Sequence, residues 1–509
     1  VTGVQTCALP IWPRKPAGHW LFDPARSGGM VLDLMIHDLD LARWVAGDVV
    51  AVQCRSAAVE RPGLGVDHSF AILTHASGAI SHVTGSWAYG MPAFRTAMEI
   101  AVPGELSSAP YVAMTLALMR SFGASVEQMV DASITGRNGR VTTQVDVHGR
   151  EIPNAARHVV RARAGQDVVL TLDEELQYQT EQALMAKVEE LGARGGSAIV
   201  MDSRSGEIYS MASVRRDEAT GVLHVGSANY AATDSYEPGS VAKVITVSAA
   251  LNEGTVTPET EFTVPFRKKY WDEWLHDAEV HPTEAMTVQQ ILARSSNIGT
   301  IGISATIGPD RQEAYMRAFG LGEPTALDFP GEARGILRPN SKWRGTENVT
   351  VAYGQGVAAT AIQLVSAINV IANDGNYVAP KLVRAVVSAD GRRDETMPSA
   401  MRRVVSSEVA AEMNQLMRDV VCEGTARGWA RIKGYTIAGK TGTGFKAQKN
   451  GTYLDANGLH SYYSSFVGFL PAEDPRITVL VSIDEPPASA EHFGANTAAP
   501  VFNKIAKAA

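Results

Sequence analysis

One Ser-x-x-Lys pair in the sequence has the residue types and the spacing that nucleophilic catalysis needs. The segment DSYEPGSVAKV predicts a helix that opens near Pro238, with Ser240 in its first turn and Lys243 on the same face. A Ser hydroxyl is a poor nucleophile until a neighbouring base takes its proton, and burial or a second cation can lower the pKa of a Lys enough for that task. The helix N-terminus adds N–H groups that favour negative charge. Taken alone, the pair is more typical of a helix-capping Ser followed by a solvated Lys than of a catalytic site.

A second polar motif, Ser295-Ser296-Asn297, lies in QQILARSSNIGTIG. It is predicted at a break between two helices, where Ser and Asn usually act as caps. The motif is weak evidence of a site by itself, because capping alone would explain it.

A third motif, Lys440-Thr441-Gly442-Thr443, is predicted on a strand near the end of the chain. Side chains alternate along a strand, so Lys440 and Gly442 share one face while Thr441 and Thr443 share the other. Because Gly442 has no side chain, we expect a peptide substrate to approach here and to add beside the strand.

These motifs must be positioned by elements from both ends of the second half of the chain. A strand, a long helix ending at Gly192 and a hairpin turning at 203–206 come first. A helical region follows over about 238–430, and three strands (434–444, 460–471 and 476–485) close the chain. This order predicts an α+β fold with one antiparallel sheet built from both ends and flanked by helices.

In this order, the three motifs resemble those of penicillin-binding proteins. Residues 129–509 resemble a class B penicillin-binding protein, a peptidoglycan D,D-transpeptidase of the cell-division type. Further blocks in family order carry the likeness: LTLDEELQ, YEPGSVAKV, SSNIG, YGQGVAATAIQL, EGTARG, GKTGTG, SFVGFLPAEDP and FGANTAAPVF. The resemblance implies the penicillin-binding transpeptidase fold over residues 163–509, with 129–162 as a remnant of the pedestal domain.

The resemblance also implies a role for each motif residue. Ser240 would be the acylated nucleophile and Lys243 its base, while Ser295 would relay protons. Asn297 would hold the substrate amide, and Lys440 would attract the substrate carboxylate and lower the pKa of Lys243. The substrate would lie along Thr441, Gly442 and Thr443, with the backbone N–H groups of Ser240 and Thr443 as the oxyanion hole. The substrates would be D-Ala-D-Ala stem peptides, and β-lactams would acylate Ser240. No metal or cofactor is implied.

Related activities share these motifs. A class A β-lactamase does not fit, because no Glu-x-x-Leu-Asn segment follows Ser295 to supply the deacylating Glu. A D,D-carboxypeptidase, which uses water as the acceptor, and a β-lactam sensor that acylates once both stay open. The family further implies a partner glycosyltransferase, divisome membrane proteins and a location on the outer face of the cytoplasmic membrane.

The first part of the chain resembles other proteins, which predicts a chimera. Residues 1–11 resemble translated adapter sequence, and 12–104 predict an antiparallel sheet with one helix, similar to the C-terminal half of the glucose–fructose oxidoreductase and inositol dehydrogenase family. Asp33 and His37 fall at that family's acid/base positions. The nucleotide-binding half that would hold NAD has no counterpart here, so a dehydrogenase activity is a remote alternative. Residues 105–128, which include Tyr111, predict a helix and resemble a piece of 5-enolpyruvylshikimate-3-phosphate synthase.

Composition narrows the remaining function classes. The chain has 509 residues, 20% of them charged, with a net charge of -8 and no basic stripe, so nucleic acid is not an expected partner. Its 3 cysteines show no metal-ligand spacing and are too few for a disulfide framework. The sequence as written also predicts neither a membrane span nor a signal peptide.

Overall fold

The computed structural model describes residues 2–4, 48–57, 68–76, 80–86, 95–101, 140–142, 158–160 and 165–509, apart from 226–228, 328, 389, 449–451, 455–457 and 488–491. The chain divides into two compact units, Val1–Thr115 with Arg137–Arg163 and Leu116–Gly136 with Ala164–Ala509. Asp33, His37, Tyr111 and the helices predicted before and after the first sheet lie outside the described residues.

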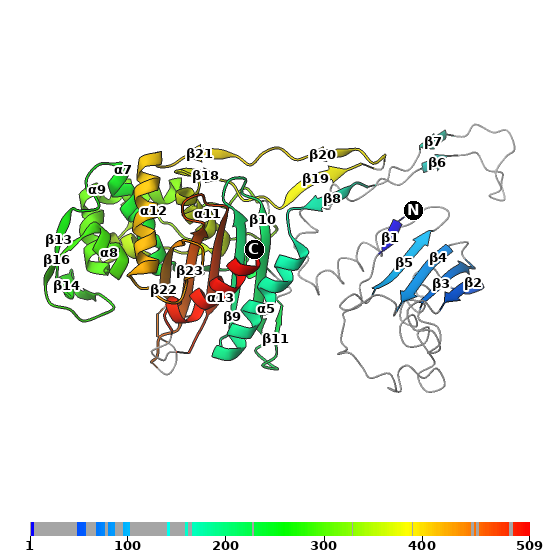
Figure 1. Ribbon diagram of the computed structural model, residues 1–509, viewed down its shortest axis with the longest axis horizontal. Coiled ribbons are helices and arrows are strands. Elements are labelled where there is room, and N and C mark those ends of the chain that lie inside the picture. The colour runs from blue at the N-terminus through cyan, green and yellow to red at the C-terminus, as the bar shows by residue number, and fades with distance from the viewer. Residues whose placement is uncertain are drawn as a thin grey trace. The chain divides into compact units, whose positions relative to one another are not determined.

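The first unit contains a five-stranded antiparallel sheet in the order β1-β5-β4-β3-β2 (Figure 1). Its strands are β1 (Thr2–Val4), β2 (Val49–Ala57), β3 (His68–His75), β4 (Ile80–Ser86) and β5 (Arg95–Ala101). The antiparallel sheet was predicted, but β1 was not, because it falls in the segment 1–11. A separate strand pair joins β6 (Arg140–Thr142) to β7 (His158–Val160).

The second unit is built on a six-stranded antiparallel sheet in the order β11-β10-β9-β24-β23-β22. Three strands precede the helical region: β9 (Gly195–Asp202), β10 (Ile208–Arg216) and β11 (Leu223–Val225). The other three follow it: β22 (Ala438–Phe445), β23 (Tyr462–Leu470) and β24 (Ile477–Asp484). The two groups join where β24 pairs with β9, with Val479 opposite Val200. The prediction of one sheet from both ends is confirmed.

Helices cover both faces of this sheet. On one face, α13 (Gly494–Ala508) packs beside α5 (Glu174–Leu191), and Phe502 of α13 meets Phe466 of β23 edge-on at 4.7 Å (Figure 1). On the other face lies α11 (Ala361–Ala372), whose Asn369 accepts a hydrogen bond of 2.6 Å from Thr478 of β24. Every residue of α11 is buried, as expected for a helix between the sheet and the helical region.

Helix α13 corrects the expectation that three strands close the chain. It follows β24 and buries Val501, Phe502 and Ile505 on one face. This helical spacing of apolar residues was visible in the sequence, although only the strands were assigned there.

The helical region carries the Ser-x-x-Lys and Ser-Ser-Asn motifs, whereas the Lys-Thr-Gly-Thr motif lies on β22. Its helices are α6 (Tyr230–Thr233), α7 (Ala242–Asn252), α8 (Val288–Arg294), α9 (Asn297–Ala318), α10 (Glu347–Thr350) and α12 (Ser407–Cys422). Two strand pairs that the sequence did not indicate interrupt it: β13 (Glu261–Val264) with β16 (Glu284–Thr287) and, between them in sequence, the hairpin of β14 (Arg267–Tyr270) with β15 (Glu273–His276). The remaining strands are β8 (Asp167–Leu170), β12 (Ser235–Tyr236), β17 (Ala359–Thr360), β18 (Asn376–Val378), β19 (Val383–Val387), β20 (Arg393–Glu395) and β21 (Met401–Arg403).

The end of helix α5 at Gly192 is confirmed as predicted. Helix α5 begins after Asp173, whose side chain accepts from Leu176 N, and it ends at Gly192, whose φ of 61° only glycine adopts at little cost.

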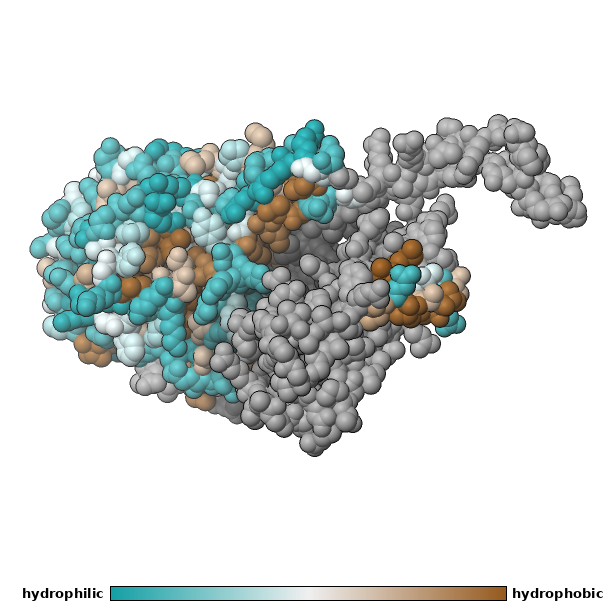
Figure 2. All heavy atoms as spheres, turned by 45° about the vertical axis from the view of Figure 1, so that its right-hand side comes forward, coloured by the Kyte–Doolittle hydropathy of each residue, from teal (hydrophilic) through white to brown (hydrophobic). Residues whose placement is uncertain are grey.

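The exterior of the second unit is mainly hydrophilic in the view of Figure 2. Within the described part of the chain, every helix is too short or too polar to cross a bilayer.

Candidate active site

Ser240 lies at the start of α7, at the junction with the sheet. A single 3₁₀ turn, Gly239–Val241, leads into α7, which begins at Ala242. The predicted helix start near Pro238 is therefore confirmed, with a tighter first turn. Ser240 is half-buried, whereas the side chain of Lys243 in the first turn of α7 is fully buried.

Close backbone packing holds this turn against β22. A Cβ atom on Gly442 would lie 2.8 Å from Pro238 O and 2.9 Å from Val241 Cγ2. A Cβ on Gly239, whose φ is 52°, would collide with the carbonyl group of Thr443. Gly442 was expected to admit a peptide substrate, but the backbone that occupies this space belongs to the turn that carries Ser240. The glycine therefore positions Ser240 beside Thr443.

Both motif lysines converge on Ser295. Lys243 Nζ donates to Ser295 Oγ at 3.2 Å and also to the Ser295 carbonyl oxygen. Lys440 Nζ donates to the same Oγ at 3.0 Å and to Thr441 O at 3.1 Å. Three motifs separated by more than 50 residues of chain thus meet at one hydroxyl. Among the described residues, the hydrogen bonds of Lys243 Nζ go to Ser295 and none goes to Ser240 Oγ.

Burial shifts the pKa of both lysines. It is the largest cause of the lowered pKa of Lys243, and the nearby charge of Lys440 lowers it further, while the carboxylate of Asp277 acts in the opposite direction. Burial also lowers the pKa of Lys440 to about 7. A buried Lys that loses its proton readily can serve as a general base near neutral pH.

The Ser-Ser-Asn motif lies at the predicted helix break. Ser295 ends α8 with φ 60° and ψ 39°, a left-handed conformation that is uncommon for residues other than glycine. Ser296 caps α9, its Oγ accepting from Gly299 N at 2.9 Å. The sharp reversal between the helices turns Ser295 towards the lysines, and strain of this kind is often found at functional sites.

Asp277 supports this break and was missed in the sequence. Its carboxylate accepts from Ser296 Oγ at 2.6 Å and from Ile298 N at 2.9 Å, and it pairs with His281 Nε2 at 3.0 Å. No spacing signal links Asp277 to the motif, because it reaches the site through the chain reversal that follows the β14–β15 hairpin.

The other predicted site residues line the same region. Asn297 Nδ2 donates to His276 O at 2.9 Å, so the amide is tied to the end of β15. Thr441 Oγ1 lies 2.8 Å from Thr425 Oγ1 in the loop after α12. Thr443 is half-buried, with its backbone against Gly239.

Glu237 connects three segments around Ser240. Its Oε1 accepts from Tyr453 Oη at 2.6 Å and from Gly356 N at 2.9 Å. Burial raises its pKa. Glu237 lies three residues before Ser240, so this carboxyl group ties the loop that carries Ser240 to the segments at Gly356 and Tyr453.

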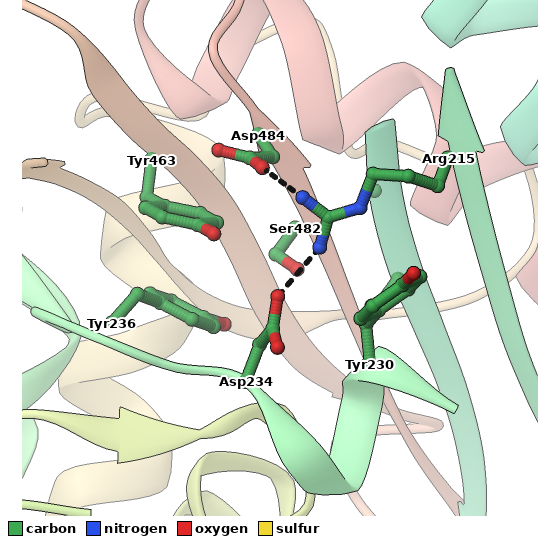
Figure 3. A pocket seen from close by; sticks show the side chains of 9 residues that line it. Arg215, Tyr230, Asp234, Tyr236, Tyr463, Ser482 and Asp484 are labelled. Carbon is green, nitrogen blue, oxygen red and sulfur yellow. Dashed lines mark hydrogen bonds and ion pairs between the residues drawn. The ribbon is translucent and has the colours of Figure 1, made fainter. Parts of the chain in front are cut away.

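A small polar pocket lies beside the segment that leads to Ser240 (Figure 3). The Arg215 guanidinium pairs with Asp234 at 2.5 Å and with Asp484 at 2.8 Å. Beside these pairs, the ring of Tyr236 stacks on that of Tyr463 with 4.6 Å between centroids. The ion pairs and the stack connect β10, β23 and β24 to Asp234 and Tyr236, which precede Ser240 in the chain. The pocket therefore supports the site from the side of the sheet.

The turn that carries Ser240, the two lysines and the left-handed Ser295 form a site suited to acyl transfer, and comparison with known proteins agrees. Residues 196–507 match the family model of the penicillin-binding protein transpeptidase domain. This chain belongs to that family. It is 33% identical over 392 residues to the penicillin-binding protein PbpB of Mycobacterium tuberculosis, which is 75% of this chain and 57% of the relative. It is 31% identical to a probable peptidoglycan D,D-transpeptidase, PenA, of Neisseria flavescens, over 67% of this chain and 81% of the relative.

A solved structure in the family has the same fold. Penicillin-binding protein 3 of Mycobacterium tuberculosis complexed with aztreonam matches with a TM-score of 0.63 at 28% identity, over 81% of this chain and 90% of that one. The resemblance to class B penicillin-binding proteins, the α+β class and the transpeptidase fold are therefore confirmed. Residues 4–105 match a different family model, the GFO/IDH/MocA C-terminal domain, which confirms the oxidoreductase-like resemblance of the first part.

Proposed function

We propose that this chain is a serine peptidoglycan D,D-transpeptidase whose activity belongs to residues 163–509. The observation that carries the proposal is the convergence of Lys243 Nζ and Lys440 Nζ on Ser295 Oγ beside the turn that holds Ser240. A hydroxyl between two buried amines provides a path for protons, and a helix N-terminus beside the nucleophile favours a developing oxyanion.

In the proposed reaction, Ser240 Oγ attacks the carbonyl carbon of the penultimate D-Ala of a stem peptide. Neutral Lys243 accepts the hydroxyl proton, and the backbone N–H groups of Ser240 and Thr443 stabilise the oxyanion. Ser295 passes a proton to the departing D-Ala amine, and the amine of a second stem then attacks the acyl-enzyme. Lys440 pairs with the substrate carboxylate, Asn297 holds its amide, and Thr441 lines the cleft beside Gly442.

The test is covalent labelling of the full chain with a fluorescent penicillin, with Ser240→Ala as the matched variant. Mass spectrometry should find the label on the peptide that contains Ser240, and the variant should take up none. A folded wild-type chain that remains unlabelled, or label that persists in Ser240→Ala, contradicts the proposal.

Transfer and hydrolysis are separated by the products. With a thioester mimic of the stem peptide and an added D-amino acid, a transpeptidase yields the aminolysis product. A carboxypeptidase yields only the free acid, and a β-lactam sensor yields neither the aminolysis product nor the free acid. The β-lactam ligands, a partner glycosyltransferase, divisome membrane proteins and a place on the outer face of the cytoplasmic membrane belong to the same proposal. So do the pedestal remnant at 129–162 and the chimeric origin of the residues before it.

A further inference from the structure

The β14–β15 hairpin has an exposed face that the reaction above does not use. Pairing across the hairpin sets Arg267 opposite His276 and Lys269 opposite Trp274, so these four side chains share one face. All four are exposed. On the other face, Tyr270 and Leu275 pack against the hydrophobic core. One face of the hairpin therefore packs against the core, and the other, which we call the outer face, exposes two cations, an indole and an imidazole.

Trp271 lies at the tip of this hairpin with a positive φ, a backbone conformation that is rare for a bulky residue. It occupies the first position of a two-residue turn with φ 52°, where glycine, asparagine or aspartate is strongly favoured. Its side chain is 57% exposed, so core packing does not compensate for the strain. A bulky residue with positive φ is an outlier, and such outliers persist mostly at functional positions.

A second indole extends the same surface. Trp274 is 55% exposed, and the Arg267 guanidinium lies 5.0 Å from its ring centroid, which holds the indole in place. Indoles exposed beside fixed cations are suited to bind a polymer that carries both apolar ring faces and negative charge. The acidic residues of the hairpin, Asp272 and Glu273, lie at the turn and on the opposite face.

The hairpin is directly connected to the active site. Asn297 Nδ2 donates to the carbonyl oxygen of His276, the last residue of β15, and Asp277 follows immediately to hold the helix break behind Ser295. A chain bound along the outer face would therefore lie close to the substrate amide position. This contiguity favours the substrate polymer over a separate macromolecule.

We propose that the outer face of the β14–β15 hairpin, with Trp271, Trp274, Arg267 and Lys269, binds the glycan strand of uncross-linked peptidoglycan. The indoles stack on the apolar faces of the sugar rings, and the cations pair with carboxylates of the stem peptides. The proposal rests on the proposed function, because it assigns part of the substrate to a surface beside the same site.

The experiment measures binding of the full chain to fluorescent, uncross-linked peptidoglycan strands that carry their stem peptides. The double variant Trp271→Gly/Trp274→Ala should bind at least about tenfold more weakly, because aromatic side chains that become buried on binding contribute most of the binding free energy at such surfaces. Penicillin acylation of Ser240 should be unchanged. Tyr178→Ala, which removes an exposed aromatic ring from α5, is the matched control and should bind as the wild type does.

The single variant Trp271→Gly separates binding from folding. Glycine relieves the positive φ, so the melting temperature should be equal to or above that of the wild type while strand binding falls. Unchanged strand binding in the double variant, with normal acylation, overturns this inference and leaves the transpeptidase proposal intact. Loss of binding to phosphatidylglycerol vesicles with unchanged strand binding also overturns it, since the surface would then face a membrane. A wild-type chain that is not acylated at Ser240 contradicts the proposed function itself.

Discussion

The backbone of Gly354 lies directly against that of Gly239, the residue before the nucleophile. A Cβ atom on Gly354 would come within 2.7 Å of Gly239 N and would overlap its carbonyl oxygen, and Gly239 N donates to Gly354 O at 3.3 Å. The turn that presents Ser240 is thus enclosed between the Gly354 turn and strand β22. Its position depends on residues that have no side chain.

Gly354→Ala should therefore disable acylation. The residue has φ 86°, and its new methyl group would push the Gly239 turn away, moving Ser240 relative to Lys243. A displacement of about 1 Å can cost roughly 100-fold in rate, and a left-handed non-glycine residue costs about 1–3 kcal/mol of stability. The second-order rate constant for penicillin acylation measures the first effect, and urea unfolding measures the second.

Gly345→Ala is the control for backbone strain. Gly345 also has a positive φ, 53°, but a Cβ there would meet nothing within 4 Å. This variant should lose a similar amount of stability and keep its acylation rate. Equal rate losses in the two variants would show that strain alone, and not the contact with Gly239, controls the nucleophile.

Acylation should depend on pH in a bell shape. Lys243 must be neutral to accept the Ser240 proton, so the rate falls as pH decreases through its pKa. Lys440 must be charged to attract the substrate carboxylate, and because burial brings its pKa to about 7, the rate falls as pH rises above that value. Stopped-flow measurement of penicillin acylation at pH 5–10 checks this. A profile that still rises at pH 9 in the wild type would contradict the assignment.

The sequence was sufficient for the elements and motifs whose signals are local. Residue spacing located Ser240 and Lys243 on one helix turn, Gly192 at a helix end and Lys440 on a strand, because each depends on near neighbours. The convergence of Lys243 and Lys440 on Ser295 could not follow from spacing. It depends on how α7, α8 and β22 pack, and only the order of the motifs, as a family resemblance, indicated it.

The contacts that the sequence did not reveal are long-range. Asp277 lies 19 positions before Ser296 and directly after the β14–β15 hairpin, which the helical prediction for 238–430 missed although the strand pair is rich in aromatic residues. Gly442 was assigned the right property, close backbone approach, with the wrong neighbour. Sequence can show that a Cβ is missing, whereas only the fold shows that Pro238 O lies in its place.

Asp277→Asn should shift the acid limb of acylation to lower pH. The Asp277 carboxylate favours the charged form of Lys243, so its neutralisation lowers the pKa of that lysine further. The variant also weakens the hydrogen bonds to Ser296 and Ile298, each a bond to a charged group, at a cost of about 1.5–3 kcal/mol. The pH profile of acylation and urea unfolding measure the two effects.

His281→Gln is the comparison for that change, since it leaves the carboxylate charged. It should keep the acid limb of the wild type even if stability decreases. An acid limb that moves equally in both variants would assign the effect to local unfolding of the helix break.

Replacement of Lys440 by Met should stabilise the second unit and remove part of its dependence on pH. The folded pKa of Lys440 is about 7 against 10.5 for an ordinary Lys, so between these values the unfolded chain holds a proton that the folded chain has released. Stability then rises with pH, by up to about 1.4 kcal/mol per pH unit for one such group. Below pH 7 Lys440 is charged in both the folded and the unfolded state, and the folded protein carries the full cost of a buried ammonium group.

Lys440→Met has no such cost, so urea unfolding at pH 6, 7, 8 and 9 should show the variant most stabilised at pH 6, with the difference shrinking as pH rises. The variant should at the same time lose acylation, which would show that the buried charge serves the reaction at the expense of the fold. Parallel stability curves for variant and wild type would mean that Lys440 keeps its proton throughout this range and that its pKa is not lowered.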